Sequence, residues 1–160
     1  MVHATAEFMS EMRSLADVTI RPARPHDVEG IFRVRTSVTE NVLTPADLSA
    51  LGITPAVIRD MIISEPCAWV AVDQGEIVGF SMIDLSEACL FAAFVLPSHE
   101  SRGIGKRLVR LAEDALFAHH PHLWLETSAS SRAASFYRHL GWGNETDVGR
   151  GDIRLEKSRD

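Results

Sequence analysis

The chain has few of the residues that define disulfide-stapled, metal-binding and membrane proteins. It has only two cysteines, Cys67 and Cys89, which lie far apart in apolar surroundings and in no metal-binding spacing. We therefore expect buried free thiols in a reducing, cytoplasmic compartment. No segment approaches the roughly 18 apolar residues of a membrane span, so we expect no membrane partner. The first 16 residues are interrupted by charged groups, which argues against a signal peptide.

Positive charge is also scarce. The 16 Lys and Arg residues are outnumbered by 22 Asp and Glu, so the formal net charge is -6. This acidic balance argues against nucleic-acid binding. A hydrophobic fraction of 46% is ordinary for a globular protein. A chain of 160 residues is expected to form one domain, here residues 17–160, after a mobile or loosely docked arm, residues 1–16.

The scarce positive charge gathers in one short segment, residues 101–110, which contains no acid. Its basic residues are Arg102, Lys106, Arg107 and Arg110. The segment joins an apolar run, residues 88–96, to a stretch with helical spacing, and it contains Gly103 and Gly105. A glycine turn that enters a helix presents N–H groups without partners and about half a positive charge. Glycine also lets a ligand approach the backbone, so the segment predicts a phosphate-binding turn.

An ordinary strand–helix connection with solvated basic residues is the alternative interpretation of this turn. Two common phosphate motifs do not fit it. A Walker motif requires glycine at position 100 and Ser or Thr at position 107, where the chain has Glu100 and Arg107. The dinucleotide fingerprint requires Gly or Ala at position 108, where the chain has Leu108.

Periodicity and turn residues predict a mixed α/β arrangement. Strands are expected at residues 18–21, 67–72, 77–84, 88–96, 123–127, from 142 and at 152–156, and helices at 27–38, 45–51, 54–63, 104–118 and 130–140. Tight turns make successive strands antiparallel, whereas the strand–helix–strand passage over 88–127 requires a parallel pair. We expect a twisted, mostly antiparallel and partly parallel sheet of six to seven strands, flanked by helices.

The turn resembles the coenzyme A loop of the GNAT superfamily of N-acetyltransferases. The matching residues are Val95-Leu96-Pro97 and Arg102-Gly103-Ile104-Gly105, and the order of elements over residues 18–157 is also similar to this fold. The resemblance implies that acetyl-coenzyme A is bound by Phe94, Val95, Leu96, Arg102, Gly103, Ile104, Gly105 and Lys106. It also implies that N–H groups at the strand end near residues 94–96 polarise the thioester carbonyl. Glu100 departs from the family's usual Gln or Arg, and its side chain should point away from the phosphates.

A second segment, residues 130–142, resembles the other signature of this family. Ala133, Phe136, Tyr137 and Gly141 match it, Trp142 replaces Phe, and Ser130 replaces an Asn that commonly contacts the pantetheine arm. The resemblance implies that Tyr137 is the general acid that protonates the leaving thiolate and that Ser130 contacts the coenzyme. Taken alone, Phe136 and Tyr137 are better explained as core aromatics of a short helix.

The resemblance assigns no general base, because the strand at residues 88–96 lacks the carboxylate that the family often places there. Glu126, near the end of the following strand, is a candidate base that faces the cleft, or it pairs with a nearby arginine. His119, His120 and His122 are a candidate metal cluster or a solvated helix end. We expect no metal.

The chain is thus expected to be an acetyl-coenzyme A-dependent N-acetyltransferase that acts on a primary amine by direct attack. The alternatives are a non-catalytic acyl-coenzyme A-binding sensor and an interaction module on the same fold. The acceptor, expected to be a small molecule, is not identified by any motif. Many members of the family pair through their C-terminal strands, which implies a possible homodimer.

Overall fold

The computed structural model describes residues 18–160, so the arm expected over residues 1–16 lies outside the described residues. The strands are β1 (Thr19–Pro22), β2 (Ala68–Asp73), β3 (Glu76–Asp84), β4 (Cys89–Val95), β5 (His122–Ser128), β6 (Gly143–Gly149) and β7 (Asp152–Ser158). The helices are η1 (Pro25–Asp27), α2 (Val28–Arg35), α3 (Pro45–Ala50), α4 (Pro55–Ser64), η2 (Pro97–His99), α5 (Ile104–Phe117) and α6 (Arg132–His139). Among these residues no helix has both the length and the apolarity needed to cross a bilayer.

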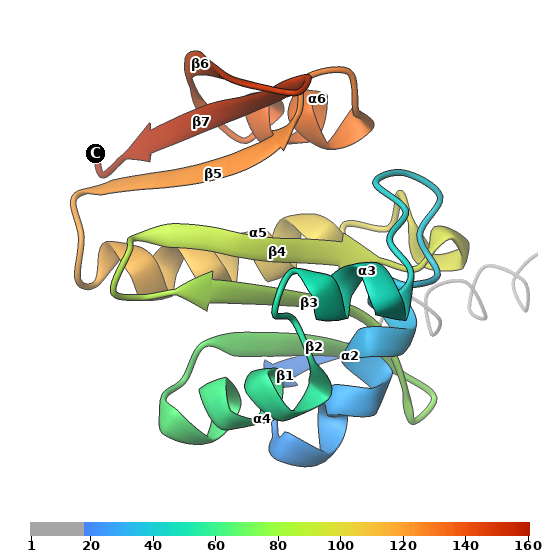
Figure 1. Ribbon diagram of the computed structural model, residues 1–160. Coiled ribbons are helices and arrows are strands. Elements are labelled where there is room, and N and C mark those ends of the chain that lie inside the picture. Colours follow the sequence, from blue (N-terminus) through green and yellow to red (C-terminus); the bar gives the residue numbers. More distant parts are fainter. Residues whose placement is uncertain (1–17) are drawn as a thin grey trace, which may run out of the picture.

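Over residues 18–160, seven strands form a single sheet in the order β1-β2-β3-β4-β5-β7-β6. Every neighbouring pair is antiparallel except β4 and β5, which are parallel. The expected mixed sheet of six to seven strands is therefore confirmed, as is the parallel pair. However, β4 and β5 are in register only at Cys89 and Trp124. Beyond that pair the two strands diverge, as Figure 1 shows, and the sheet opens between them.

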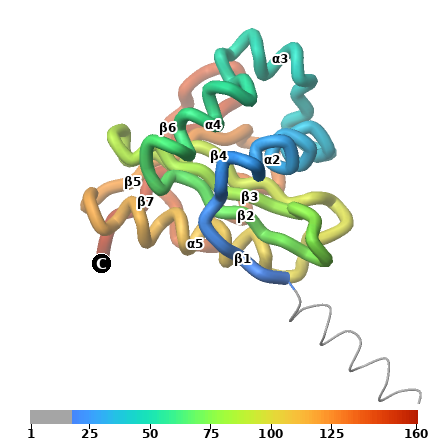
Figure 2. Tube along the Cα trace, turned by 90° about the horizontal axis from the view of Figure 1, so that it is seen from below, coloured from blue at the N-terminus to red at the C-terminus, as the bar shows by residue number. Residues whose placement is uncertain are grey.

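Helices cover both faces of the sheet. In Figures 1 and 2, α2 and α4 lie on one face and α5 lies on the other. Helix α5 buries Ile104, Leu108, Ala112 and Leu116, which are spaced four residues apart and form one stripe. Each of α3 and α4 begins with proline after a threonine whose hydroxyl accepts a hydrogen bond from a backbone N–H three residues on.

The two cysteines occupy the core, as the sequence predicted. Cys67 and Cys89 are both buried and unpaired. Burial raises the pKa of the Cys67 thiol to about 11 and that of the Cys89 thiol to about 12. A thiol that stays protonated is a poor nucleophile, so neither cysteine is suited to reaction.

Asp27 directly precedes α2 and forms a largely buried ion pair. It stands at the N-cap of α2, but its carboxylate caps no N–H of that helix. Instead it accepts hydrogen bonds from Nη1 and Nη2 of Arg21, at 2.7 and 3.0 Å, and from the backbone N–H of Arg24. Asp27 is only 4% exposed, so it forms a largely buried ion pair that fixes β1 against η1.

Replacement of Asp27 by asparagine is expected to cost about 1–3 kcal/mol of unfolding free energy. Burial alone would raise the pKa of the Asp27 carboxyl, but the hydrogen bonds from Arg21 and Arg24 lower it below its ordinary value of 3.8. Its contribution is therefore complete above about pH 4 and is lost as pH falls through the lowered value. Urea unfolding from pH 2 to pH 6 should show that the unfolding free energy falls less steeply toward low pH (the acid limb) in Asp27→Asn than in the parent. Equal acid limbs would contradict this role.

Candidate active site

The opening between β4 and β5 is a cleft of about 500 Å³, within the usual range for small-molecule sites. Its walls come from β4, the turn after it, the start of α5, the end of β5, α6, and the segment at residues 38–41. Because the strands part after a single register pair, the cleft reaches the sheet itself and is not merely a surface groove. Elements far apart in sequence therefore meet at one place.

The glycine turn forms one end of this cleft. Gly103 has φ +80°, Ser101 has φ 64°, and α5 begins directly after Gly103 with no side chain capping it. The first turn of α5 contains no acid. Successive N–H groups in such a turn form a concave site for an anion, strengthened by the dipole of a 14-residue helix. A Cβ built on Gly105 would lie 3.6 Å from Phe136 Cζ and 3.7 Å from Val95 Cγ2, at the contact between α5, α6 and β4.

Seven of the predicted site residues line the cleft together. They are Phe94, Val95, Gly103, Gly105, Lys106, Glu126 and Tyr137. The other predicted residues do not line it: Leu96, Arg102, Ile104 and Ser130. Ile104 is 3% exposed and packs into the core below the turn. The N–H of Leu96 donates to the carbonyl of Val78 at 2.8 Å, so it is engaged within the protein.

The serine that lines the cleft is one position later than predicted. Ser131, at the N-cap of α6, lines the cleft, and its hydroxyl accepts a hydrogen bond from the N–H of Ala134. Ser130 is exposed, and its hydroxyl lies 3.4 Å from that of Ser128. The predicted helix began at residue 130, but α6 begins at Arg132, which accounts for the difference.

Tyr137 is 8% exposed and lies between the cleft and the core. Its ring contacts those of Phe136 and Trp142, with centroids 5.5 and 6.1 Å apart. The ring thus packs in the core, as one interpretation of the sequence held, and the residue also lines the cleft, where the proposed general acid would have to lie. Burial, and then the negative charge of Glu113, raise the pKa of Tyr137 above its ordinary value of 10.0. The phenol therefore stays protonated at neutral pH.

Glu113, whose charge acts on Tyr137, connects the elements that surround this tyrosine. This buried carboxylate accepts hydrogen bonds from Nε1 of Trp142 at 3.0 Å and from Nζ of Lys157 at 2.7 Å. Lys157 also donates to the carbonyl of Leu140, at the end of α6. The network ties α5, α6 and β7 together directly behind Tyr137. No sequence pattern predicts this network, because an acid on a helix that is otherwise apolar on that side gives no sign of its partners.

Glu126 is exposed on β5 and lines the cleft. Arg154 is its register partner on β7, but within residues 18–160 the two form no ion pair. Instead, the Arg154 guanidinium lies 3.9 Å from the centroid of the Trp124 ring. The alternative in which Glu126 forms an ion pair with a nearby arginine is therefore not seen among the described residues. Its carboxylate is accessible from the cleft.

An ion-pair network crosses the mouth of the cleft. Arg132 contacts Glu40 through Nε at 3.4 Å and Glu100 through Nη2 at 3.0 Å, and its backbone N–H donates to Glu40. The acid at position 100, which departs from the family pattern, is thus turned toward Arg132. Glu40 and Arg132 are 92 residues apart, so no local sequence signal could have predicted the contact.

The histidines do not gather around a common point. His120 Nε2 is 2.6 Å from the carbonyl oxygen of Leu85, and His122 Nδ1 is 2.9 Å from the hydroxyl of Ser158. In the described part of the chain no three His, Cys, Asp or Glu side chains are grouped so that they could hold a metal ion. His99, in the turn after β4, lies 2.8 Å from Asp73 and lines the cleft.

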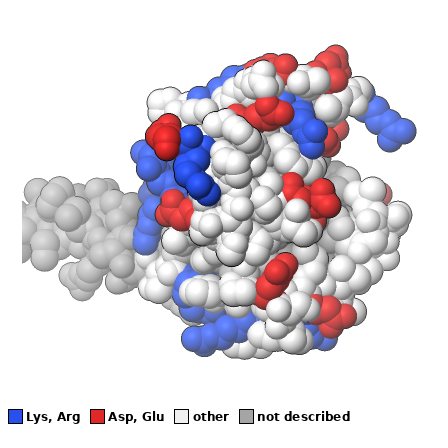
Figure 3. Space-filling view, turned by 90° about the vertical axis from the view of Figure 1, so that its left-hand side faces the viewer, with Lys and Arg blue, Asp and Glu red and all other residues white. Residues whose placement is uncertain are grey.

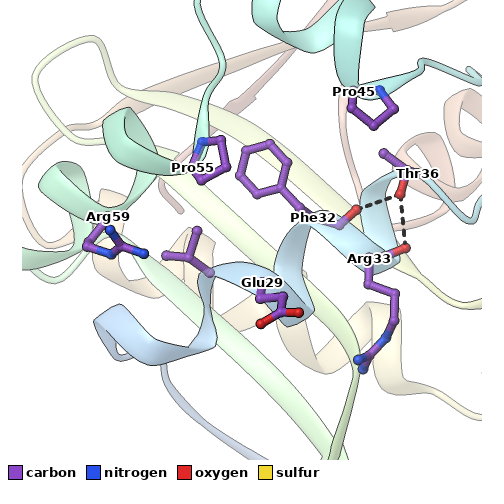
Figure 4. A pocket seen from close by; sticks show the side chains of 8 residues that line it. Glu29, Phe32, Arg33, Thr36, Pro45, Pro55 and Arg59 are labelled. Atoms are coloured by element: carbon purple, nitrogen blue, oxygen red, sulfur yellow. Dashed lines mark hydrogen bonds between the residues drawn. The ribbon is translucent and has the colours of Figure 1, made fainter.

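A second hollow, of about 400 Å³, lies between α2 and the starts of α3 and α4 (Figure 4). The Phe32 ring extends toward Pro55, while Glu29 and Arg33 extend away from it. This hollow shares no lining residue with the cleft and contains no part of the glycine turn.

On the face seen in Figure 3, the described acidic and basic side chains lie in separate small groups and form no continuous basic strip. A nucleic-acid backbone requires such a strip.

Comparison with known proteins agrees with this geometry. The sequence pattern of the acetyltransferase (GNAT) domain matches residues 64–143, and the chain belongs to that family. A peptidyl-lysine N-acetyltransferase of Escherichia coli, YiaC, is 32% identical over 99 residues. That match covers 57% of this chain and 64% of the relative, which is less than two thirds of the relative's length.

Solved structures show the same fold. The PaiA N-acetyltransferase of Thermoplasma acidophilum, in complex with coenzyme A, has a TM-score of 0.71 at 17% identity, covering 89% of this chain and 99% of that one. Ard1 of Thermoplasma volcanium has a TM-score of 0.69 at 19% identity, covering 89% and 97%. The expected GNAT-like fold is confirmed.

Proposed function

We propose that the protein is an N-acetyltransferase that moves an acetyl group from acetyl-coenzyme A to a primary amine. The observation that carries the proposal is the position of the uncapped start of α5, which opens into the cleft where β4 and β5 part. A helix N-terminus with N–H groups free of intrahelical partners is a binding site for a pyrophosphate, and the cleft beside the parted strands has room for the pantetheine arm. The two features adjoin here, and membership of the family agrees with them.

The residues divide into two binding groups in this proposal. The turn at Gly103 and Gly105, with Lys106, binds the pyrophosphate through backbone N–H groups and one ammonium. Phe94 and Val95, on the β4 edge, line the channel for the arm and its thioester. Arg102 contributes charge at the entrance, and Leu96 and Ile104 contribute by shaping the turn. We transfer the predicted role of Ser130 to Ser131, because Ser131 lines the cleft.

The chemistry requires a neutral amine. An alkylamine of pKa near 10.4 is only about 0.04% neutral at pH 7, which costs roughly 4–5 kcal/mol. Glu126 accepts the proton of the incoming ammonium, directly or through water. The neutral amine nitrogen bonds to the acetyl carbonyl carbon and loses its second proton to water, and the carbon–sulfur bond breaks to leave the amide. Tyr137 gives its proton to the departing thiolate, and the phenolate recovers a proton from water.

Two measurements test this function. Acetyl-coenzyme A at about 100 times its Kd should add about 2.7 kcal/mol of stability and raise the Tm by roughly 5–10 °C. Thiol release in the presence of an amine panel should then show turnover. A Tm that does not move would favour an interaction module. A raised Tm without thiol release from any amine would favour an acyl-coenzyme A sensor.

We also propose a homodimer in the cytoplasm. Strand β6 ends the sheet, and its residues from Asn144 to Gly149 are exposed, including Val148 at 43%. An exposed edge strand can pair with a second copy. The two unpaired buried thiols fit a reducing compartment. Light scattering at working concentration should give twice the mass of one chain, whereas the mass of a single chain would remove the dimer.

A further inference from the structure

A separate apolar cavity of about 140 Å³ lies between the sheet and the helices on its α2 side. Most of its wall is aliphatic or aromatic, from Ile31, Phe32, Leu43, Leu48, Ile53, Ile58, Phe80 and Met82. Four further residues, Asn41, Phe91, Ala92 and Phe94, line both this cavity and the active-site cleft. The cavity therefore adjoins the cleft along β4, away from the glycine turn.

The size and lining of the cavity suit one apolar side chain. A cavity of about 150 Å³ lined by Leu, Ile and Phe stays dry and takes up benzene in a well-studied protein. The cavity here is of similar size and similar lining. Phe91, at its boundary with the cleft, is 43% exposed, although it is large and apolar. A branched aliphatic or aromatic group in the cavity would cover part of that ring.

Arg35 adds a charge to the wall of this apolar space. Its guanidinium lies 4.3 Å from the centroid of the Phe94 ring, and Nη1 donates to the carbonyl of Asn41 at 3.0 Å. Within residues 18–160 no acidic side chain pairs with it, in contrast to Arg21 and Arg138, which each contact a carboxylate. A guanidinium has five N–H donors, so several remain for a ligand.

The surroundings of Arg35 favour an anion as that ligand. Burial lowers the pKa of the Arg35 guanidinium, because a charge is disfavoured among apolar groups. A bound carboxylate would offset this cost with charge-assisted hydrogen bonds, and guanidinium and carboxylate geometries match. The anion would lie beside Phe94, at the boundary between cavity and cleft.

We propose that the acceptor is a free α-amino acid with an apolar side chain, its carboxylate on Arg35 and its side chain in the cavity. The inference rests on the proposed function. The carboxylate, side chain and amine of such a molecule share one carbon atom. With the first two held by Arg35 and the cavity, the amine faces the shared boundary at Phe91 and Ala92 and opens into the cleft that Glu126 also lines. A peptidyl lysine cannot place a carboxylate so near its amine.

The test compares matched acceptors by thiol release from acetyl-coenzyme A: leucine and phenylalanine, their amides, and a lysine-containing peptide. The free amino acids are expected to exceed their amides in kcat/KM by about 10- to 100-fold, the usual range for hydrogen bonds to a charged group. Arg35→Gln should lower kcat/KM for the free amino acids to the value for their amides, mainly by raising KM. It should leave kcat/KM for the amides unchanged. Arg33→Gln, two positions earlier on an exposed face of α2, is the matched control and should keep the preference.

A second pair of variants tests the cavity. Leu43→Trp fills it and should lower kcat/KM for phenylalanine more than for glycine, whereas Val42→Trp, at a position 62% exposed, should change neither. The Tm shift with acetyl-coenzyme A shows that each variant is folded. Equal rates for acid and amide, or faster release with the lysine peptide, would overturn the inference and leave the proposed function standing. Absence of coenzyme binding in the parent would overturn both.

Discussion

Gly105→Val is expected to fold normally and to bind acetyl-coenzyme A at least about 100-fold more weakly than the parent. A Cβ at this position meets Phe136 Cζ at 3.6 Å and Val95 Cγ2 at 3.7 Å, which are ordinary contacts. The two further methyl groups of valine must then extend against Phe136 or into the cleft. Methyl groups that extend into the cleft block the approach of the pyrophosphate to the N–H groups of the turn, which lowers the affinity for the coenzyme.

The fold should survive because valine is no worse than glycine in a helix. Thermal unfolding of Gly105→Val should therefore lie within about 1 kcal/mol of the parent, while calorimetry shows the lost affinity. Gly143→Val is a matched control, since its Cβ would meet no atom within 4 Å and the residue lies outside the cleft, in β6. Unchanged affinity in Gly105→Val would mean that the turn is only a connector.

Gly103 is a less clean position for the same test. Its φ of +80° suits glycine, and an added Cβ would meet no atom within 4 Å. Valine there is strained by the backbone conformation rather than by contact, at a cost of roughly 1–2 kcal/mol. Gly103→Val is therefore expected to lose both stability and coenzyme affinity. Only a comparison of the two variants separates strain in the turn from obstruction of the cleft.

Most of the fold could be predicted because its signals are local. Proline and threonine fix the starts of α3 and α4, and Asp73-Gln74-Gly75-Glu76 fixes the turn between β2 and β3. The need for a parallel neighbour followed from the helix between β4 and β5. The limit to one register pair, Cys89 with Trp124, did not follow, because it depends on how α5 and α6 pack against the two strands. That divergence creates the cleft.

The site residues also differ in whether their signals are local in the sequence. Gly105 was predicted because glycine at a helix start leaves a pattern in the sequence, and Tyr137 because residues 130–142 resemble the second signature of the family. Arg35 above Phe94, and Arg132 between Glu40 and Glu100, leave none, because their partners come from distant segments. Trp142 was expected to begin a strand, but β6 begins one residue later, at Gly143. Trp142 is instead buried, at 2% exposed, and its indole N–H donates to the carboxylate of Glu113.

Tyr137 can be titrated without interference, because it is the only tyrosine in the chain. Burial and the nearby charge of Glu113 raise its pKa above 10.0. The absorbance change of tyrosinate should therefore appear above pH 10 in the folded protein. For the same reason the parent's kcat should not decline near pH 10, since the acid is still protonated there. A decline at that pH, absent from Tyr137→Phe, would show that the phenol titrates normally and that burial does not control it.

Tyr137→Phe is expected to lower kcat by roughly 10²-fold or more, the usual range for loss of a general acid. The change keeps the ring and its contacts with Phe136 and Trp142, and it removes one hydroxyl. Within residues 18–160 no hydrogen-bond partner of that hydroxyl is found, so unfolding free energy should stay within about 1 kcal/mol of the parent. Coenzyme affinity should change little, because the turn at Gly103 and Gly105 supplies most of it. Stopped-flow thiol release measures kcat, and calorimetry on the same samples measures coenzyme affinity and unfolding. If the ring served only the core, turnover per folded molecule would be normal, and a variant that folds, binds and turns over at the parent rate would end the general-acid assignment.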